Sequence, residues 1–207
     1  MKNKEKYQRG QGKYASIESL CRAWILFCTI SFFGWAFETA LHYIRFSEYT
    51  DRGFLTLPFC PIYGGSIFLT VYLFGVPQRL DGIIDKQALR IGAMRKILRR
   101  KVLRFAFYFV SVTLVSTVAE LITGTVFKLL GKPLWDYSDK PLNIFGVVCL
   151  PYSLAWGVMI TVAMGVLWIP LTRLVKRISP WYSKRIAFLL FVAIAVDFAV
   201  NLIKIPL

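Results

Sequence analysis

Residues 24–44 read WILFCTISFFGWAFETALHYI, and this stretch decides the fold. It holds one acidic residue, Glu38, and no Lys or Arg. About 20 residues at about 1.5 Å rise each make a helix that crosses the roughly 30 Å hydrocarbon core of a bilayer. Four further apolar segments have this length or more: residues 54–76, 105–127, 142–171 and 186–206. The sequence therefore predicts an all-α, polytopic membrane helix bundle of about five transmembrane helices, forming one transmembrane domain over residues 1–207.

The composition agrees with a membrane protein and excludes two other classes. Of the 207 residues, 57% are hydrophobic and 18% are charged, and the mean hydropathy is +0.56. So much apolar surface is incompatible with a disordered chain. A net charge of +15 would suit a nucleic-acid-binding module, but all the basic residues except Lys204 lie outside the apolar segments. We therefore expect no nucleic-acid partner and a bilayer as the main surroundings.

The distribution of Lys and Arg predicts the orientation in the membrane. Twenty of the 26 basic residues fall in three stretches, residues 1–22, 77–104 and 172–185. Basic residues concentrate in the short cytoplasmic segments of membrane proteins. We expect residues 1–22 to be a cytoplasmic N-terminal segment without a cleavable signal peptide, and the C-terminus to lie outside.

The basic connection at residues 77–104 also has an apolar periodicity. Five apolar residues recur at helical spacing among its Arg and Lys residues: Leu80, Ile84, Ile91, Met94 and Leu98. An amphipathic helix of this kind lies in the membrane interface. A docking surface for a separate cytoplasmic protein is the alternative that the sequence leaves open.

Two parts of the chain repeat a short pattern. Glu38 lies in the first apolar segment, and PFCPIYGG (58–65) begins the second. Glu120 lies in the third, and GVVCLPYSLAWG (146–157) begins the fourth. Both halves thus combine an acidic residue with a following Cys, Pro, Tyr and Gly. The pattern predicts two parallel hairpin repeats, related by an axis along the membrane normal, plus a fifth helix.

Three carboxylates lie inside predicted helices: Glu38, Glu120 and Asp197. A charged group at the centre of a membrane helix costs roughly 2.5–3.5 kcal/mol on insertion scales. We therefore expect each carboxylate to have a partner or a role that offsets this cost. His42 continues the face of Glu38, and Asn201 continues the face of Asp197, each four residues later. Together they predict a polar cavity in the outer half of the bundle. The alternative is that single residues only bond neighbouring helices or sit at the interface.

Known motifs of catalysis and cofactor binding are absent from the sequence. It has no phosphate-binding loop and no Gly-x-Ser-x-Gly motif, and its one histidine and four separated cysteines give no metal-site spacing. We expect no cofactor, no metal and no assigned catalytic residue. An intramembrane acid–base enzyme that uses Glu38 with His42, or Glu120 with Asp197, remains an alternative.

Four motifs resemble a known family. FGWAFET (33–39), RGFLTLPFCPIYGG (52–65), WDYSDKPLNIFG (135–146) and YSLAWG (152–157) are similar to bacterial integral membrane proteins labelled "putative ABC-transporter type IV" or "putative ABC transporter permease". The resemblance implies a permease-like, multi-pass protein of the bacterial plasma membrane. Leu57 departs from the Gly that many members have at this position.

These observations lead to one functional hypothesis with two alternatives. We expect a permease-like protein that binds or translocates a small polar or lipid-like solute through an outward-facing polar cavity. The alternatives are an intramembrane enzyme acting on a lipid-linked substrate, and a non-catalytic membrane partner or regulator that docks a cytoplasmic protein at residues 77–104. A homo-oligomer is also left open. The candidate solute-binding residues are Glu38, His42, Arg52, Tyr63, Glu120, Asp136, Asn143, Tyr152, Trp156, Asp197 and Asn201.

Overall fold

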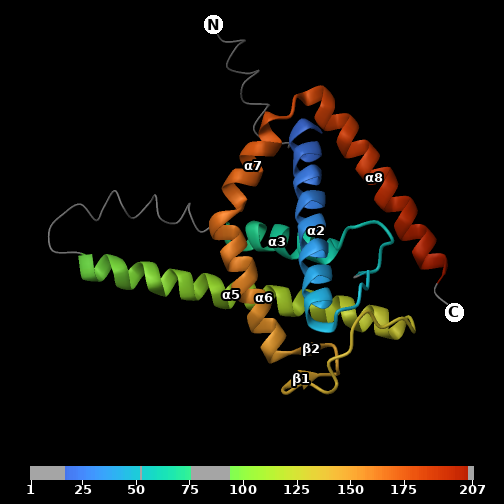
Figure 1. The fold of residues 1–207 in the computed structure, drawn as a ribbon. Coiled ribbons are helices and arrows are strands. Elements are labelled where there is room, and N and C mark those ends of the chain that lie inside the picture. Colours follow the sequence, from blue (N-terminus) through green and yellow to red (C-terminus); the bar gives the residue numbers. More distant parts are fainter. Residues whose placement is uncertain (1–16, 52, 76–93, 205–207) are drawn as a thin grey trace, which may run out of the picture.

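The computed structural model describes residues 17–51, 53–75 and 94–204, and these form six helices and one small β-hairpin (Figure 1). In chain order the elements are α2 (Ile17–Phe46), α3 (Pro61–Phe74), α5 (Met94–Leu129), β1 (Asn143–Ile144), β2 (Val148–Cys149), α6 (Leu150–Val166), α7 (Trp168–Arg177) and α8 (Pro180–Ile203). The predicted all-α class is confirmed.

Three helices correspond to predicted membrane segments. Within the described residues α2, the Phe105–Leu129 part of α5, and α8 are each long and apolar enough to cross a membrane. The first and third predicted segments lie inside α2 and α5, and α8 includes residues 186–203 of the fifth. Large apolar side chains are exposed along all three, for example Val118 on α5 and Phe188 on α8. An apolar surface of this extent fits contact with lipid rather than with water.

The second predicted segment forms a shorter helix than expected. Only Pro61–Phe74 are helical, which gives α3 14 residues and a length of about 21 Å. Residues 53–60 before it are irregular. Pro61 occupies the first turn of α3, where proline is tolerated because the first amides have no helical partner. Pro58 lacks an amide hydrogen, and the residue before each proline is disfavoured in a helix. These prolines explain why the helix does not begin earlier.

The fourth predicted segment is not one continuous helix, so the expectation of a helix over residues 142–171 is corrected. Its first part is an antiparallel hairpin in which Asn143 pairs with Cys149 and Ile144 with Val148. The rest is divided into α6 and α7, which meet at a bend of 51°. Pro170 explains the bend, because it cannot donate a hydrogen bond to the preceding turn and its ring crowds that turn. Counted as one span, α6 and α7 make a fourth candidate membrane crossing.

The helices cross one another rather than lie as parallel rods. In Figure 1, α2 and the α6–α7 pair run up and down the view, α8 slants away from the α7–α8 corner, and α3 and α5 lie across α2. The tightest packing is between α5 and α6, and α2 packs on both α8 and α3. A shared core fills the crossings, with Ile25, Tyr108, Val112, Ile160 and Met164 among its buried members.

Glycine permits the close crossing of α2 and α3. A Cβ atom on Gly64 would lie 2.6 Å from Ser31 Oγ and 2.8 Å from Phe27 Cδ2. The amide of Cys60, which caps α3, also donates to the Ser31 carbonyl at 3.0 Å. Small residues at helix crossings let backbones approach in membrane proteins.

A second glycine has the same role between α5 and α6. A Cβ atom on Gly157 would overlap the hydroxyl of Thr113 and lie 3.0 Å from the Phe109 ring. Cys149 caps α6 in an extended conformation, as Cys60 caps α3, and each cap is followed by a proline in the first turn.

The basic residues near the α7–α8 corner lie at the same end of the molecule as the start of α2 (Figure 1). Arg22 of α2 donates from Nη2 to the Ile178 carbonyl in this corner at 2.9 Å and pairs with Glu18. The remaining predictions about basic segments fall mostly on residues 1–16 and 76–93, and the side chains of residues 94–101 and 104 are not described either. The amphipathic connection therefore lies largely outside the described residues.

Candidate functional site

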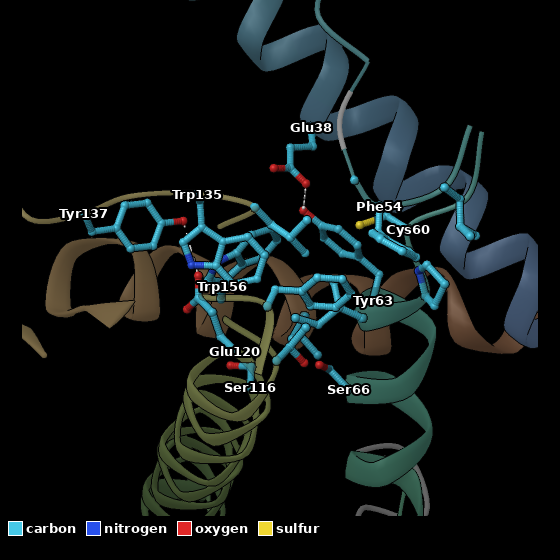
Figure 2. Close-up of a pocket in the computed structure, with 18 of the residues that line it drawn as sticks. Glu38, Phe54, Cys60, Tyr63, Ser66, Ser116, Glu120, Trp135, Tyr137 and Trp156 are labelled. Atoms are coloured by element: carbon cyan, nitrogen blue, oxygen red, sulfur yellow. Dashed lines mark hydrogen bonds between the residues drawn. The ribbon is translucent and has the colours of Figure 1, made fainter. Parts of the chain in front are cut away.

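A cavity of about 350 Å³ lies where α2, α3, α5 and α6 meet, and Figure 2 shows its side chains. The loop before α3 and the loop after α5 complete its wall. Most lining side chains are aromatic or aliphatic, and two carboxylates face the cavity. Its wall contains Glu38, Phe54, Cys60, Tyr63, Ser66, Ser116, Glu120, Phe127, Trp135, Tyr137, Trp156 and Phe198, among others.

Glu38 comes from the last third of α2 and is held by a tyrosine of α3. Tyr63 Oη donates to Glu38 Oε2 at 2.9 Å (Figure 2). Gly34 lies one helical turn before Glu38, and a Cβ atom there would overlap the Tyr63 ring. Because position 34 has no side chain, the ring packs against α2 and its hydroxyl reaches the carboxylate. Tyr63 is 7% exposed, so this pair is an interior feature.

Glu120 comes from α5 and is held in a similar way. Tyr137 Oη donates to Glu120 Oε1 at 3.2 Å (Figure 2), and the Trp156 side chain of α6 also interacts with this carboxylate. Glu120 is 4% exposed, and its second oxygen, Oε2, has no hydrogen-bond partner among the described residues. Glu38 lies close enough to contribute to the electrostatic field at Glu120. The cavity therefore brings two carboxylates from different helices together.

Aromatic contacts connect the two halves of the site. The Tyr63 and Trp156 rings meet edge to face with centroids 4.8 Å apart. Tyr137 stacks on Tyr152 at the same centroid distance, and Arg45 Nη1 donates to Tyr152 Oη at 3.0 Å. Such pairs favour defined ring orientations, which keeps the hydroxyl groups directed at their carboxylates.

The loop after α5 is held in place by its own polar groups. Trp135 Nε1 donates to the Val147 carbonyl at 2.7 Å, and both side chains pack over Gly124. Asp136 Oδ1 accepts hydrogen bonds from the backbone amide and the hydroxyl of Ser138. These bonds lower the pKa of Asp136.

Tyr137 is the residue of this loop that enters the cavity. Burial raises the pKa of the Tyr137 phenol well above its usual value, and the nearby Glu120 and Glu38 carboxylates raise it further. Its hydroxyl group thus stays protonated at neutral pH and remains a hydrogen-bond donor to Glu120.

Asp197 lies elsewhere and anchors the loop before α3. Its Oδ2 accepts from the Leu57 amide at 2.9 Å, and its Oδ1 accepts from Asn201 Nδ2 at 3.0 Å. Asn201 also bonds with Thr56 Oγ1 at 3.0 Å. The polar face of α8 therefore holds residues 56–57, whereas its Phe198 side chain reaches the cavity.

The structure places only some of the candidate residues from the sequence in the cavity wall. Glu38, Tyr63, Glu120 and Trp156 line the cavity, whereas Tyr152 stacks behind Tyr137. Five others have their described contacts away from the wall: His42, Asp136, Asn143, Asp197 and Asn201. Arg52 lies outside the described residues.

Sequence reasoning missed several wall residues. Ser116 lies four residues before Glu120 on α5, so its helical spacing was a usable signal. Phe54, Phe127 and Phe198 carried none, because apolar residues in membrane segments face lipid as often as the interior. Their role depends on how the helices cross.

The described part of the chain has no metal-binding constellation. No group of three or more His, Cys, Asp or Glu side chains is placed there to hold a metal ion. Among the described residues, Cys21, Cys28, Cys60 and Cys149 form no disulfide bond.

The long apolar helices, their lipid-facing surfaces and the internal cavity define an α-helical membrane protein. The family model described as "Putative ABC-transporter type IV" matches residues 25–202. The chain belongs to this family, which confirms the resemblance drawn from its motifs. Comparisons with curated proteins and with solved structures gave no match.

Proposed function

We propose that this protein is a permease-like, multi-pass protein of the bacterial plasma membrane, which binds or translocates a small polar or lipid-like solute through the cavity. One observation carries the proposal: Glu38 and Glu120 come from different helices and face the same cavity. Carboxylates inside membrane helices mark solute or ion pathways because their burial is costly. The family description, which names a transporter, supports the same reading.

Matching contacts in the two halves support an internal duplication. Three α2 residues and three α5 residues share one spacing: Phe27, Ser31 and Glu38, and Phe109, Thr113 and Glu120. In each triplet the first two residues contact a glycine of the following helix, α3 or α6. The residue before that glycine is aromatic and interacts with the glutamate of its own half. The cavity would then lie at the junction of two related hairpins, as solute sites do in repeat-built transporters.

The distribution of charge supports an outward-facing cavity. Five basic residues lie on α7 and the first two turns of α8: Arg173, Lys176, Arg177, Lys184 and Arg185. Glu38 is near the opposite end of α2 from Arg22, which contacts this basic corner. By the positive-inside rule the corner is cytoplasmic, and the cavity belongs to the outer half of the membrane.

The contacts offer less support to acid–base catalysis. His42 Nδ1 lies 3.3 Å from the Glu48 carbonyl, and its ring packs on Phe46 rather than in the wall of the cavity. Asp197 binds the Leu57 amide, so it is not placed as a partner of Glu120. We therefore favour solute binding over the enzymatic alternative.

Proteoliposomes exposed to a mixture of solutes test the proposal. Vesicles containing the wild-type protein are incubated with a bacterial metabolite extract, washed, and analysed by mass spectrometry. We expect at least one solute to be retained by wild-type vesicles and lost in Glu38→Gln and Glu120→Gln vesicles. Glu48→Gln is the matched control, because it makes the same chemical change at an exposed position beyond the end of α2. Wild-type vesicles with the same contents as protein-free vesicles would refute the proposal.

The direction of the opening can be tested separately through Cys60, which lines the cavity. A variant with Cys21, Cys28 and Cys149 replaced by Ala keeps this single thiol. We expect a membrane-impermeant methanethiosulfonate reagent to label it from outside intact cells, and we expect no labelling after a further Cys60→Ala change. Labelling only after the cells are permeabilised would contradict an outward-facing cavity.

A further inference from the structure

The hydrogen-bonding groups of the cavity wall are distributed unevenly. Several donors of the wall are already engaged, since Tyr63 Oη and Tyr137 Oη donate to the two glutamates and Trp135 Nε1 donates to the Val147 carbonyl. Ser116 Oγ similarly donates to a carbonyl of its own helix. One acceptor of the wall is not engaged: Oε2 of Glu120 is buried and has no hydrogen-bond partner among the described residues. The wall therefore requires a donor from its ligand.

Leaving this oxygen without a partner is costly. A buried polar atom without a hydrogen bond is destabilising relative to a satisfied one, and a charged group more so. Glu38 adds a second negative group to the same cavity. A ligand that brings a hydrogen bond and a positive charge would satisfy both requirements, because charge-assisted bonds to carboxylates are the strong ones.

None of the three basic residues described near the site is itself a lining residue, and each is engaged with another group. Arg45 donates to the Tyr152 hydroxyl, Lys128 donates to the Phe145 carbonyl, and Lys132 Nζ lies over the Phe54 ring at 5.3 Å from its centroid. Of the described residues that line the cavity, none is Lys, Arg or His. A ligand with a negative group would find no described counter-charge in the wall.

Aromatic rings in the cavity wall are the second feature, after the carboxylates, that a ligand would contact. Tyr63 and Trp156 sit against one another beside the two carboxylates, and their polar edges are directed at Glu38 and Glu120. The rings of these two residues and of Trp135 line the cavity together (Figure 2). Aromatic faces attract cations, and Trp does so most strongly. A volume of about 350 Å³ is at the small end of ligand cavities and fits a single-ring compound better than a lipid with long chains.

We propose that the cavity binds a small organic cation, a primary or secondary ammonium on an apolar or aromatic body, with the nitrogen donating to Glu120 Oε2 and the body lying against Trp156 and Tyr63. The inference rests on the solute-binding function proposed above and names its substrate class.

Three probes of nearly the same shape test the class: 2-phenylethylammonium, 2-phenylethanol and 3-phenylpropanoate. Each is titrated into the purified full-length protein in detergent, and binding is followed by tryptophan fluorescence and by thermal shift. We expect the ammonium to bind about tenfold or more tightly than the alcohol, as a charge-assisted bond predicts, and the carboxylate to bind more weakly than both. In Glu120→Gln this preference for the ammonium should disappear, whereas Glu48→Gln should keep it.

A second variant covers the case in which Glu120→Gln does not fold. Trp156→Leu keeps the carboxylate and removes one aromatic face, and we expect it to weaken ammonium binding roughly threefold or more with little effect on the alcohol. Equal binding of the three probes, no binding of any probe, or unchanged preference in both variants would overturn the cation proposal. Stronger binding of 3-phenylpropanoate would also overturn it, and would point to Arg52, which adjoins the lining residue Gly53 and lies outside the described residues.

The two proposals fail in different ways. If the proteoliposomes retain a neutral or anionic solute in a Glu38- and Glu120-dependent manner, solute binding stands and the cation class is wrong. If the vesicles retain nothing above the protein-free control, the proposed function itself fails.

Discussion

Replacing Asp197 with Ala should destabilise the protein without removing a cavity group. The Asp197 carboxylate accepts one hydrogen bond from the Leu57 amide at 2.9 Å and one from Asn201 at 3.0 Å. The loop that it holds contains Phe54 and Leu55, which are buried against Phe127 and Leu134. We therefore expect the variant to release this loop from α8.

The size of the effect follows from the bonds that are lost. A hydrogen bond to a charged group contributes about 1.5–3 kcal/mol, and polar bonds between membrane helices average nearer to 0.6 kcal/mol. The Leu57 amide also loses its partner, so we expect a decrease in the free energy of unfolding of about 1.5–3 kcal/mol. At about 2–4 °C per kcal/mol for a chain of this size, the Tm should fall by roughly 3–12 °C.

Thermal unfolding of the purified protein in one detergent, at one scan rate, measures this change. Asp139→Ala is the matched control, because Asp139 is an exposed carboxylate whose described ion pair is with the adjacent Lys140, and such exposed pairs contribute little to stability. Protease cleavage within residues 47–60 should also increase in Asp197→Ala alone. A Tm for Asp197→Ala that equals the Tm of the control would refute the anchoring role. Loss of probe binding at an unchanged Tm would instead make Asp197 a binding residue.

Three further predictions concern packing and pH. Gly64→Ala should lower the unfolding free energy by about 1–3 kcal/mol because its Cβ would overlap Ser31 Oγ. Adding Ser31→Ala to this variant should recover part of the loss. If the Tm change of the double variant equals the sum of the two single changes, the direct contact is contradicted. Because the pKa of the Tyr137 phenol is raised in the folded protein, the protonated phenol stabilises the fold fully at pH values below its pKa in the unfolded chain, about 10. This stabilisation is lost as the pH rises above that value. Wild-type protein should therefore lose more stability between about pH 9 and 11 than Tyr137→Phe, and parallel pH curves of Tm would exclude this role. The lowered pKa of Asp136 has the opposite sign, since the bonds from Ser138 stabilise the loop above about pH 4 and are lost as the pH falls. Cleavage of residues 135–147 by an acid-stable protease should increase below that pH in wild-type protein, and Asp136→Asn should show no such dependence.

The apolar helices were the most predictable part of the fold. Segments 24–44 and 105–127 lie within α2 and α5, and residues 186–203 of the fifth segment lie within α8, because a long run of apolar residues without proline has little alternative to a helix. The other two segments contain prolines, and there the sequence alone misjudged the bounds. Residues 53–60 are irregular, and residues 143–149 form a hairpin whose turn includes Gly146 at φ 69°.

The candidate site was only partly predictable. Glu38 and Glu120 were singled out because acidic residues are rare in apolar segments, and both line the cavity. Asp197 was singled out for the same reason, yet its carboxylate binds the Leu57 backbone. Rarity in a segment identifies a residue that needs a partner but does not say which partner it has.

The sequence by itself determined the environment and the family of this protein, because hydrophobicity, segment length and motif spacing are local properties of the chain. The tertiary structure alone decided which polar groups share a cavity. That outcome depends on the rotation of each helix about its axis and on the angles at which helices cross. Glycines at positions 34, 64 and 157 set those crossings by contacts between residues far apart in the chain. For this reason Glu38 and Glu120 face one cavity, while Asp197 holds a loop.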